Sequence, residues 1–367
     1  MHPKTKPCYT CGMEQNYQQQ LETLLDIVYQ NGASDLHLSS GRHPFIRVNE
    51  ELNEVSTYPE LSAEDMIGLV TIFAGDEKAA KLANLEEVDF AYNYGDKLRL
   101  RGNAYVQSNK ISIALRTIQK IKTLAELKMP ETLLQFTHAR QGFFLVVGPV
   151  GSGKSTTLAA MIDVINTERR EHIITIEHPI EYIHPEKKSI IDQREVGLDT
   201  KSFHAALESA FREDVNVILV GEMQTPETIA TAVTAAETGH LVFSTLHTNS
   251  AAQTVDRIID SFAPEQQEQV RIQLAGSLLG IFSQRLIPSL KGGLVPAYEL
   301  LINTPAVSNL IREKRTHELD TIIETGTEHG MISMNRSLIE LVRGGEISID
   351  DAKSFSTNVN ALEGMMQ

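Results

Sequence analysis

Cysteine and tryptophan are almost missing from this chain. Its 367 residues contain no tryptophan and only two cysteines, Cys8 and Cys11, which form a single C-x-x-C near the start. Because a zinc site needs about four ligands and no second cysteine pair follows, a metal could bind here only with help from a residue such as His2 or from another subunit. The alternative is a reduced pair without a metal.

Long apolar runs and an excess of basic charge are also lacking. No stretch approaches the roughly 18 to 20 apolar residues that span a bilayer, and the N-terminus has no signal-peptide core. With 33 Lys and Arg against 48 Asp and Glu, the net charge is −15, which argues against non-specific binding to nucleic acid or to an anionic membrane surface. We therefore expect a cytoplasmic protein with no transmembrane segment and no nucleic-acid partner, able to dock on a membrane complex. The length and the 41% hydrophobic content favour two globular domains.

A glycine-rich segment at residues 148–155 has the P-loop spacing G-x-x-x-x-G-K-[ST]. The apolar run 143–147 before it predicts a buried strand, and residues 157–166 after it predict a helix. Backbone N–H groups of such a loop and the helix N-terminus can surround phosphates. Lys154 would reach the β- and γ-phosphates, and the Ser155 hydroxyl would bind Mg²⁺. The residues expected to bind the nucleotide are Gly148, Pro149, Val150, Gly151, Ser152, Gly153, Lys154, Ser155 and Thr156.

Three more apolar segments each lead directly into polar residues. Residues 173–176 precede Glu177 and Glu181, residues 217–220 precede Glu222, and residues 241–245 precede His247. Strands separated by helical segments favour a largely parallel sheet, whose ligands lie beyond the carboxyl ends of the strands. We therefore expect these side chains to converge with the P-loop on one site.

The roles of these side chains follow from their chemistry. Glu222 ends a strand where a Walker B acid would lie, so it is the candidate to polarise the attacking water and to contact Mg²⁺ through water. Glu177 and Glu181 flank a proline, and either could hold the water shell of the metal or orient the nucleophile. His240 and His247, seven residues apart across one strand, could report the state of the phosphate or be ordinary packed histidines.

The first third of the chain predicts an α+β domain. Helical spacing begins at Asn16 and ends before residue 31; strands are expected at 35–38, 45–48, 98–106 and 111–118, and a helix at 63–72. Alternation places Arg99 and Arg101 on one face of their strand, and Arg116 on the polar face of the next. Exposed arginines are most often only solvated. The alternative is that they act as arginine fingers on the nucleotide of a neighbouring subunit.

The whole chain is expected to comprise four parts. They are an irregular extension at 1–13, the N-terminal domain at 14–118, a linker at 119–124, and the nucleotide-binding domain at 125–367. Beyond Ser250 the last part is expected to be helical, with Leu274, Leu278, Leu279 and Ile281 in its core, and its tail from about residue 354 is expected to fray.

Taken together, the motifs resemble the type II and type IV secretion ATPases, and most closely the PilT family of type IV pilus retraction motors. The resemblance covers nearly the whole chain. Besides the P-loop it rests on the N-terminal signature at 32–38, the Asp box at 175–181, Walker B at 217–223, the His box at 238–248 and an AIRNLIRE-like segment at 306–313.

This resemblance implies a PAS-like N-terminal domain, followed by a RecA-like P-loop ATPase domain with a mainly parallel sheet and a helical C-terminal part. It also implies ATP and Mg²⁺ as ligands and a ring-shaped homohexamer that binds ATP between the domains of its subunits. The motor would dock at the inner face of the cytoplasmic membrane on the platform of the pilus machine, with a second retraction ATPase as a further candidate partner. The carry-over makes Glu181 and Glu222 the catalytic acids, places His240 and His247 in a sensing box, and matches Arg99, Arg101 and Arg116 to family arginines.

The expected function is therefore an ATP-hydrolysing motor for pilus retraction and twitching motility. An assembly or type II secretion ATPase is one alternative, but such proteins commonly carry a four-cysteine zinc insertion, and no cysteine follows Cys11. A slow nucleotide-binding accessory subunit is another: the intact Lys154, Glu181 and Glu222 oppose it, and the altered family arginines favour it. Those positions are Asn109, Gln224 and Ser308; a further departure from the family is His178 in place of Asp.

Overall fold

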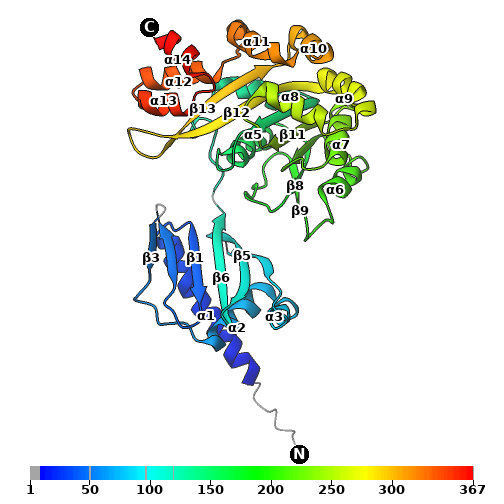
Figure 1. Ribbon diagram of the computed structural model, residues 1–367. Helices are drawn as coiled ribbons and strands as arrows, with labels where there is room; N and C mark the ends of the chain where they lie inside the picture. The colour runs from blue at the N-terminus through cyan, green and yellow to red at the C-terminus, as the bar shows by residue number, and fades with distance from the viewer. Residues whose placement is uncertain (1–8, 49–50, 96, 119, 367) are drawn as a thin grey trace, which may run out of the picture. The chain divides into compact units, whose positions relative to one another are not determined.

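The computed structural model describes residues 9–48, 51–95, 97–118 and 120–366 (Figure 1). The chain divides into two compact units on either side of residue 119. In the described residues, no helix is long and apolar enough to cross a membrane. The predicted fold class is confirmed: an N-terminal α+β domain precedes a domain built on a mainly parallel sheet.

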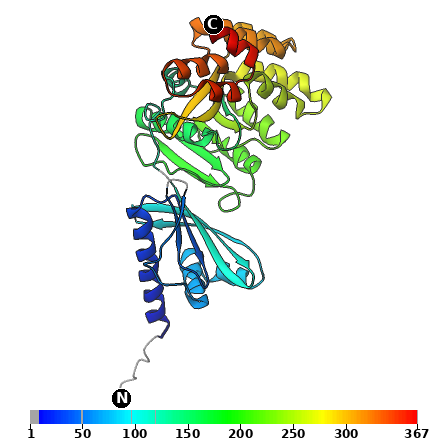
Figure 2. The same ribbon diagram turned by 60° about the vertical axis from the view of Figure 1, so that its left-hand side comes forward.

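The first unit is a six-stranded antiparallel sheet with helices on one face. The strands lie in the order β3-β2-β1-β6-β5-β4, and alternation along them turns apolar side chains such as Leu36, Leu100 and Leu115 toward Leu21 and Leu69 of the helices. Figure 2 shows the long α1 alongside this sheet. The elements are α1 Tyr9–Gln30, β1 Asp35–Ser39, β2 Phe45–Val48, β3 Glu51–Glu54, α2 Ala63–Ala74, α3 Asp76–Leu82, β4 Val88–Tyr94, β5 Leu98–Gln107 and β6 Lys110–Ile118.

The start of the first unit differs from the expectation. Helix α1 begins at Tyr9, so part of the segment 1–13 expected to be irregular is helical. In this part apolar residues do not recur at helical spacing, so the sequence pattern does not predict a helix here. The helix is a continuation of the amphipathic turns that follow it. Cys8 lies outside the described residues and so does the side chain of Cys11, so the proposed C-x-x-C chemistry concerns groups that the structure does not describe. Strand β4 was not expected, although Val88 and Phe90 alternate with polar neighbours in the way that predicts a strand.

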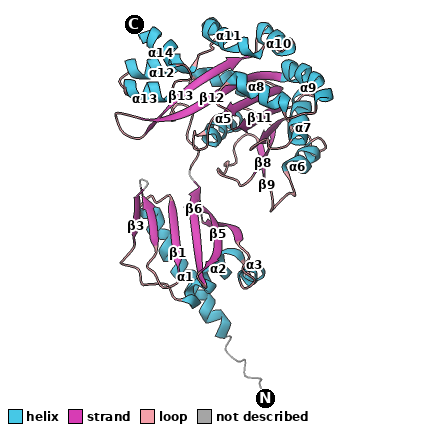
Figure 3. Ribbon diagram, viewed as in Figure 1, coloured by secondary structure: helices cyan, strands magenta, loops and turns pink. Residues whose placement is uncertain are grey.

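The second unit is a seven-stranded sheet covered on both faces (Figure 3). In the order β13-β12-β7-β11-β10-β8-β9, only β13 runs antiparallel to its neighbour. Helix α5 packs on one face through Leu158 and Ile162, while α6 to α9 cover the other. The strands are β7 Gly142–Val147, β8 His172–Glu177, β9 Ile190–Glu195, β10 Val217–Val220, β11 Leu241–Leu246, β12 Leu278–Pro288 and β13 Leu294–Ile302. The helices are η1 Glu131–Leu133, α4 Leu134–Thr137, α5 Lys154–Glu168, α6 Phe203–Ala210, α7 Pro226–Glu237, α8 Ala251–Asp260, α9 Pro264–Ser277, α10 Pro305–Arg312, η2 Thr316–Glu318, α11 Leu319–Thr325, η3 Gly326–His329, α12 Met334–Arg343, α13 Ile349–Phe355 and α14 Val359–Met366.

The expectation that the chain is helical throughout beyond Ser250 is wrong. Leu278, Leu279 and Ile281 lie in β12, which pairs with β7 and with β13. A short continuous apolar run fits a fully buried strand as well as a buried helix, so periodicity could not separate the two. The helical C-terminal part is real, but it begins at α10.

The expectation of a frayed tail is also wrong. Helix α14 packs back onto the unit through Leu362, which is fully buried beside Ile287 and Leu338. Asn335 on α12 anchors the connection before this helix: its Nδ2 donates to the carbonyl of Asn358 at 2.8 Å, and its Oδ1 accepts from the Ser356 hydroxyl at 2.7 Å. These contacts join segments about twenty residues apart, so no local pattern could reveal them.

Shortening Leu362 should destabilise the second unit. We expect Leu362→Ala to lower its free energy of unfolding by about 2 to 5 kcal/mol, because the change removes buried methyl groups and leaves a cavity. Val359→Ala on the same helix is the matched control, since Val359 is 40% exposed, and it should change stability by less than about 1 kcal/mol. Urea denaturation followed by circular dichroism measures both; equal effects would contradict the packing of α14.

Candidate functional site

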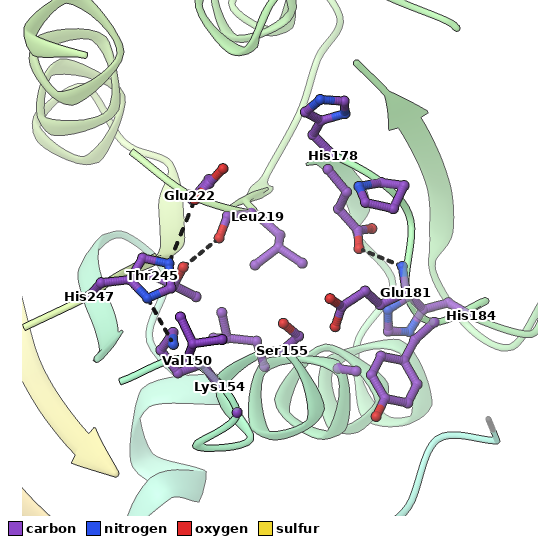
Figure 4. A pocket seen from close by; sticks show the side chains of 17 residues that line it. Val150, Lys154, Ser155, His178, Glu181, His184, Leu219, Glu222, Thr245 and His247 are labelled. Carbon is purple, nitrogen blue, oxygen red and sulfur yellow. Dashed lines mark hydrogen bonds and ion pairs between the residues drawn. The ribbon is translucent and has the colours of Figure 1, made fainter. Parts of the chain in front are cut away.

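The carboxyl ends of four parallel strands meet at one edge of the second sheet. β7, β11, β10 and β8 are successive neighbours in parallel register, so the residue that follows each strand faces the same space. A cavity of about 230 Å³ lies there (Figure 4). It is lined by Val150, Gly151, Lys154, Ser155, Leu158, Ala159, Glu177, His178, Pro179, Glu181, Tyr182, His184, Leu219, Gly221, Glu222, Thr245 and His247.

The glycine-rich loop between β7 and α5 takes a shape that side chains would prevent. Gly148 has φ 150°, and a Cβ there would lie 2.3 Å from the carbonyl oxygen of Gln284. Gly153 is left-handed with φ 83° and precedes the first residue of α5. Four of the nine loop residues expected at the site line the cavity: Val150, Gly151, Lys154 and Ser155. The other five, Gly148, Pro149, Ser152, Gly153 and Thr156, shape the loop around it.

Lys154 is a cation enclosed by the loop. Its Nζ donates to the carbonyls of Gly148 at 3.0 Å and Pro149 at 2.8 Å, and it lies 3.5 Å from Nδ1 of His247. Burial lowers the pKa of Lys154, and Glu181 and Glu222 act in the opposite direction. A buried ammonium whose nearest partners are neutral carbonyls can exchange them for an anion, which suits a phosphate.

Glu177 and Glu181 differ sharply in how their carboxylates are used. Glu177 accepts hydrogen bonds from the Thr175 hydroxyl at 2.7 Å, from Gln193 Nε2 at 3.3 Å and from the backbone N–H of Glu181 at 3.4 Å. Burial is the main cause that raises the pKa of Glu177. The Glu181 carboxylate instead points into the cavity on the side of Ser155 (Figure 4). Glu177 is therefore placed to hold the loop after β8, and Glu181 to meet a ligand.

Glu222 and His247 lie next to each other, on the side of the cavity opposite Glu181 (Figure 4). Glu222 Oε2 lies 3.8 Å from Nε2 of His247, and its Oε1 accepts from the side-chain amide of Gln224. Burial lowers the pKa of His247, and Lys154 lowers it further. Because an ammonium has no lone pair to offer, Nδ1 of His247 accepts from Lys154 and the ring proton belongs on Nε2, toward Glu222.

His240 does not share this site, contrary to the expectation that both histidines act together. It lies just before β11, at the opposite end from His247, and six strand residues separate them by about 20 Å. Its Nδ1 bonds the carbonyl of Ala235 at 3.0 Å, and its ring packs edge-on against Phe211. Seven residues along a strand place two side chains far apart, which sequence proximity concealed.

The three expected arginines belong to the first unit, whereas the cavity described above is built from residues of the second. Arg101 and Arg116 are cross-strand partners, and Arg116 is in turn opposite Asp35. Nε of Arg116 donates to Oδ1 of Asp35 at 2.9 Å. Arg101 is exposed, whereas Nε of Arg99 is buried without a hydrogen-bond partner. The face they share is polar, as the alternation predicts.

Sequence reasoning missed Tyr182 and His184 in this cavity. The hydroxyl of Tyr182 hydrogen-bonds the hydroxyl of Thr156 at 2.8 Å, which ties the loop after β8 to α5. His184 is 9% exposed, and burial lowers its pKa to about 4, so it stays neutral near pH 7. Their positions three and five residues after Pro179, alternating with Ile183 just beyond Glu181, were the available signal.

The loop that follows His247 is held in place by β12 and β13, the two strands that lie beyond β7 in the same sheet. Asn249 accepts from the Ser283 hydroxyl on β12 at 3.1 Å, and Glu299 on β13 accepts from the N–H of Ala251 at 2.9 Å. Glu299 is 6% exposed, and burial is the main cause that raises its pKa to about 7. The helix N-terminus of α8 is thus held by a buried carboxyl group.

Comparisons with known proteins agree with this geometry. The sequence model of the family described as type II/IV secretion system protein matches residues 14–338. The type IV pilus retraction ATPase PilT of Pseudomonas aeruginosa is 44% identical over 331 residues, which are 90% of this chain and 96% of that protein. A twitching motility protein of Neisseria gonorrhoeae is 45% identical over 321 residues, 87% of this chain and 86% of that protein. The crystal structure of the pilus retraction motor PilT with bound ADP has a TM-score of 0.89 at 44% identity and covers 94% of this chain and 99% of that one.

The parallel sheet, the glycine loop and the ring of polar side chains define an ATPase of the P-loop class with a RecA-like core. The chain belongs to the type II/IV secretion system protein family. The resemblance to PilT ATPases that its motifs suggested is confirmed.

Glu299 should make the stability of the second unit depend on pH. Its pKa is about 7 when folded and about 4.5 when unfolded, so the folded state binds more protons between these values. The free energy of unfolding should therefore fall as pH rises from about 4.5 to 7 and level off above that, by up to about 3 kcal/mol for this group. Glu299→Gln should remove this part of the slope.

Urea unfolding at pH 5 and pH 8 measures the effect. Glu324→Gln is the control, because Glu324 lines the same polar hollow as Glu299 but is exposed, and it should keep the slope of the unmodified protein. Parallel pH curves for the protein and Glu299→Gln would contradict the burial of an ionisable Glu299.

Proposed function

We propose that this chain hydrolyses ATP with Mg²⁺ and uses the energy to retract type IV pili. The observation that carries the proposal is the convergence of Lys154, Ser155, Glu181, Glu222 and His247 on one cavity beside the glycine loop. The relatives named for pilus retraction and twitching motility, which align over nearly their full lengths, support the biological part.

The loop residues would hold the phosphates of ATP, and Lys154 would neutralise the β- and γ-phosphates. In the described residues, no three His, Cys, Asp or Glu side chains are grouped to bind a metal by themselves, which suits Mg²⁺, an ion held mainly by phosphate oxygens and water. The Ser155 hydroxyl would supply one protein ligand, and Glu222 would contact the ion through water. When bound, Mg²⁺ would neutralise charge on the β- and γ-phosphates.

Glu177 was expected to share the contact with Mg²⁺ through water. We propose Glu181 for this role instead, because the carboxylate of Glu177 already accepts three hydrogen bonds from the protein. Glu177 would then position the loop that carries Glu181. A carboxylate aimed into the cavity can orient water, whereas one committed to the protein cannot do so without breaking those bonds.

Hydrolysis would proceed by attack of a water oxygen on the γ-phosphorus. A bond forms between that oxygen and phosphorus while the bond from phosphorus to the β–γ bridging oxygen breaks, and the water proton passes to the carboxylate of Glu222. Lys154 would stabilise the charge that develops on the phosphate oxygens. His247, close to both Lys154 and Glu222, would respond to the presence of the γ-phosphate.

Assembly and partners extend the proposal. A homohexamer would let Arg99, Arg101 or Arg116 of one subunit reach the nucleotide of another. The motor would dock from the cytoplasm on the inner-membrane platform of the pilus machine, with a second retraction ATPase as a candidate partner. Arg101, being exposed and not in an ion pair with Asp35, is the best placed of the three for such a contact.

The altered family positions do not favour the accessory-subunit alternative. Asn109 has φ 59° in the hairpin turn between β5 and β6, a conformation that asparagine tolerates well. The Ser308 hydroxyl on α10 donates to the carbonyl of Ala275 at 2.9 Å, so it packs into the unit. His178 lines the cavity, and Gln224 contacts Glu222. None of these changes removes a group that the proposed chemistry needs.

Glu222→Gln should keep nucleotide binding and lose turnover. The amide keeps the size of the side chain but cannot take a proton from water, so we expect the rate to fall about 10²- to 10³-fold with ATP affinity changed less than about threefold. Phosphate release and binding of a fluorescent ATP analogue measure the two quantities. Glu208→Gln is the control, an exposed carboxylate on α6; turnover by Glu222→Gln equal to this control would remove Glu222 from the mechanism.

The motor proposal is tested by turnover measured against protein concentration, with light scattering on the same samples. Turnover that rises as a six-subunit species forms supports sites completed between subunits. Nucleotide binding with hydrolysis at the level of Glu222→Gln would favour the accessory subunit instead.

A further inference from the structure

Gln284 is a buried polar residue that the proposed chemistry does not use. It lies on β12, the parallel neighbour of β7, one residue past the point where Ser283 is paired with Val147. Its position is therefore beside the start of the glycine loop. The residue is 1% exposed, so its amide must find partners within the protein.

Both ends of this amide are hydrogen-bonded to the nucleotide loop and the helix that follows it. Oε1 of Gln284 accepts from the hydroxyl of Thr157 in the first turn of α5 at 2.7 Å. Nε2 donates to the backbone carbonyl of Ser152 at 2.7 Å. One side chain, more than 120 residues away in sequence, thus joins the loop to the helix at whose N-terminus an anion would bind.

The backbone of the loop also packs against Gln284. A Cβ on Gly148 would meet the carbonyl oxygen of Gln284 at 2.3 Å, and one on Gly153 would meet its Nε2 at 2.8 Å. At each of the two glycines the atom nearest to such a Cβ belongs to Gln284. Gly148 and Gly153 therefore allow the loop to pack closely against β12, in addition to leaving room for a ligand.

We propose that Gln284 is a positioning residue that holds the glycine loop in its phosphate-binding conformation, an inference that rests on the proposed nucleotide-binding function. In a trans peptide the C=O and N–H groups point in opposite directions. By fixing the carbonyl of Ser152 toward β12, the Gln284 amide directs the N–H of Gly153 away from β12. Without that bond the peptide is free to rotate, and a carbonyl turned toward a bound phosphate would repel it.

Gln284→Glu tests this inference through pH. An ionised glutamate keeps the acceptor for Thr157 but cannot donate to the Ser152 carbonyl, so at pH 8 we expect binding of a fluorescent ADP analogue to weaken about tenfold or more relative to the unmodified protein. Protonation restores an O–H donor, and burial favours the protonated form. The ratio of the two dissociation constants should therefore return toward one as pH falls to about 5.5, a recovery that general damage to the fold would not produce.

Two further variants complete the design. Gln267→Glu is the matched control, because Gln267 also donates to a backbone carbonyl, that of Phe262 at 3.1 Å, but far along the chain from the loop; it should leave the ratio near one at every pH. Thr157→Val keeps the shape of the side chain and removes its donor to Gln284, so it should weaken binding about threefold or more without a pH trend. Thermal unfolding without nucleotide checks that each variant is folded.

The outcomes distinguish a failure of the proposed nucleotide-binding function from a failure of the proposed role of Gln284. If the unmodified protein binds no nucleotide, the proposed function fails. If it binds, and folded Gln284→Glu and Thr157→Val both bind equally well at pH 8, or the loss in Gln284→Glu does not recover at low pH, the role of Gln284 is overturned. Should Gln284→Glu fail to fold, Thr157→Val decides: weakened binding supports the inference, and unchanged binding overturns it.

Discussion

The parallel pairing of β7 with β11, and of β11 with β10 and β8 beyond it, is the constraint on which the site depends. Each strand is short and its central residues are fully buried, so register and direction are fixed by packing on both faces. Parallel direction brings all the carboxyl ends to one edge, and the polar residues that follow the strands meet there although they lie up to about a hundred residues apart. Reversing any one of these strands would move its functional residue to the other edge.

Lys154 is the central positive charge at this edge of the sheet, and the carboxylates of Glu181 and Glu222 interact with it. Its ammonium is bonded to loop carbonyls, with a neutral His247 next to it and two carboxylates at the margins of the cavity. A polyanion that carries its own metal ion can replace the carbonyl contacts and accept hydrogen bonds from backbone N–H groups of the loop. The same arrangement keeps Glu222 near a proton donor, Nε2 of His247, so its carboxylate is oriented before a ligand binds.

Strand β12 connects this site to the C-terminal helices. Gln284 contacts the glycine loop, and the next residue, Arg285, donates from Nη1 to the carbonyl of Phe355 at 2.8 Å. On the same strand Ser283 holds the loop after His247. The antiparallel pair β12 and β13 thus supports both sides of the cavity, so the part of the chain that lacks recognisable motifs is the part that holds the motifs in place.

The class of fold, the P-loop, the strands that lead to Glu177, Glu222 and His247, and the family could all be predicted from the amino-acid sequence, because these depend on short patterns of spacing and on apolar runs of a few residues. The folded structure was needed to show that residues 278–288 form a strand, that α14 packs onto the unit, that His240 lies away from His247, and that Glu177 is engaged by the protein while Glu181 points into the cavity. Each of these depends on contacts between side chains that are distant in sequence or at opposite ends of one strand. A local pattern shows which chemical groups are present. The charge and reactivity of each group depend on its burial and its hydrogen-bond partners, and these are set by neighbours that come together only on folding.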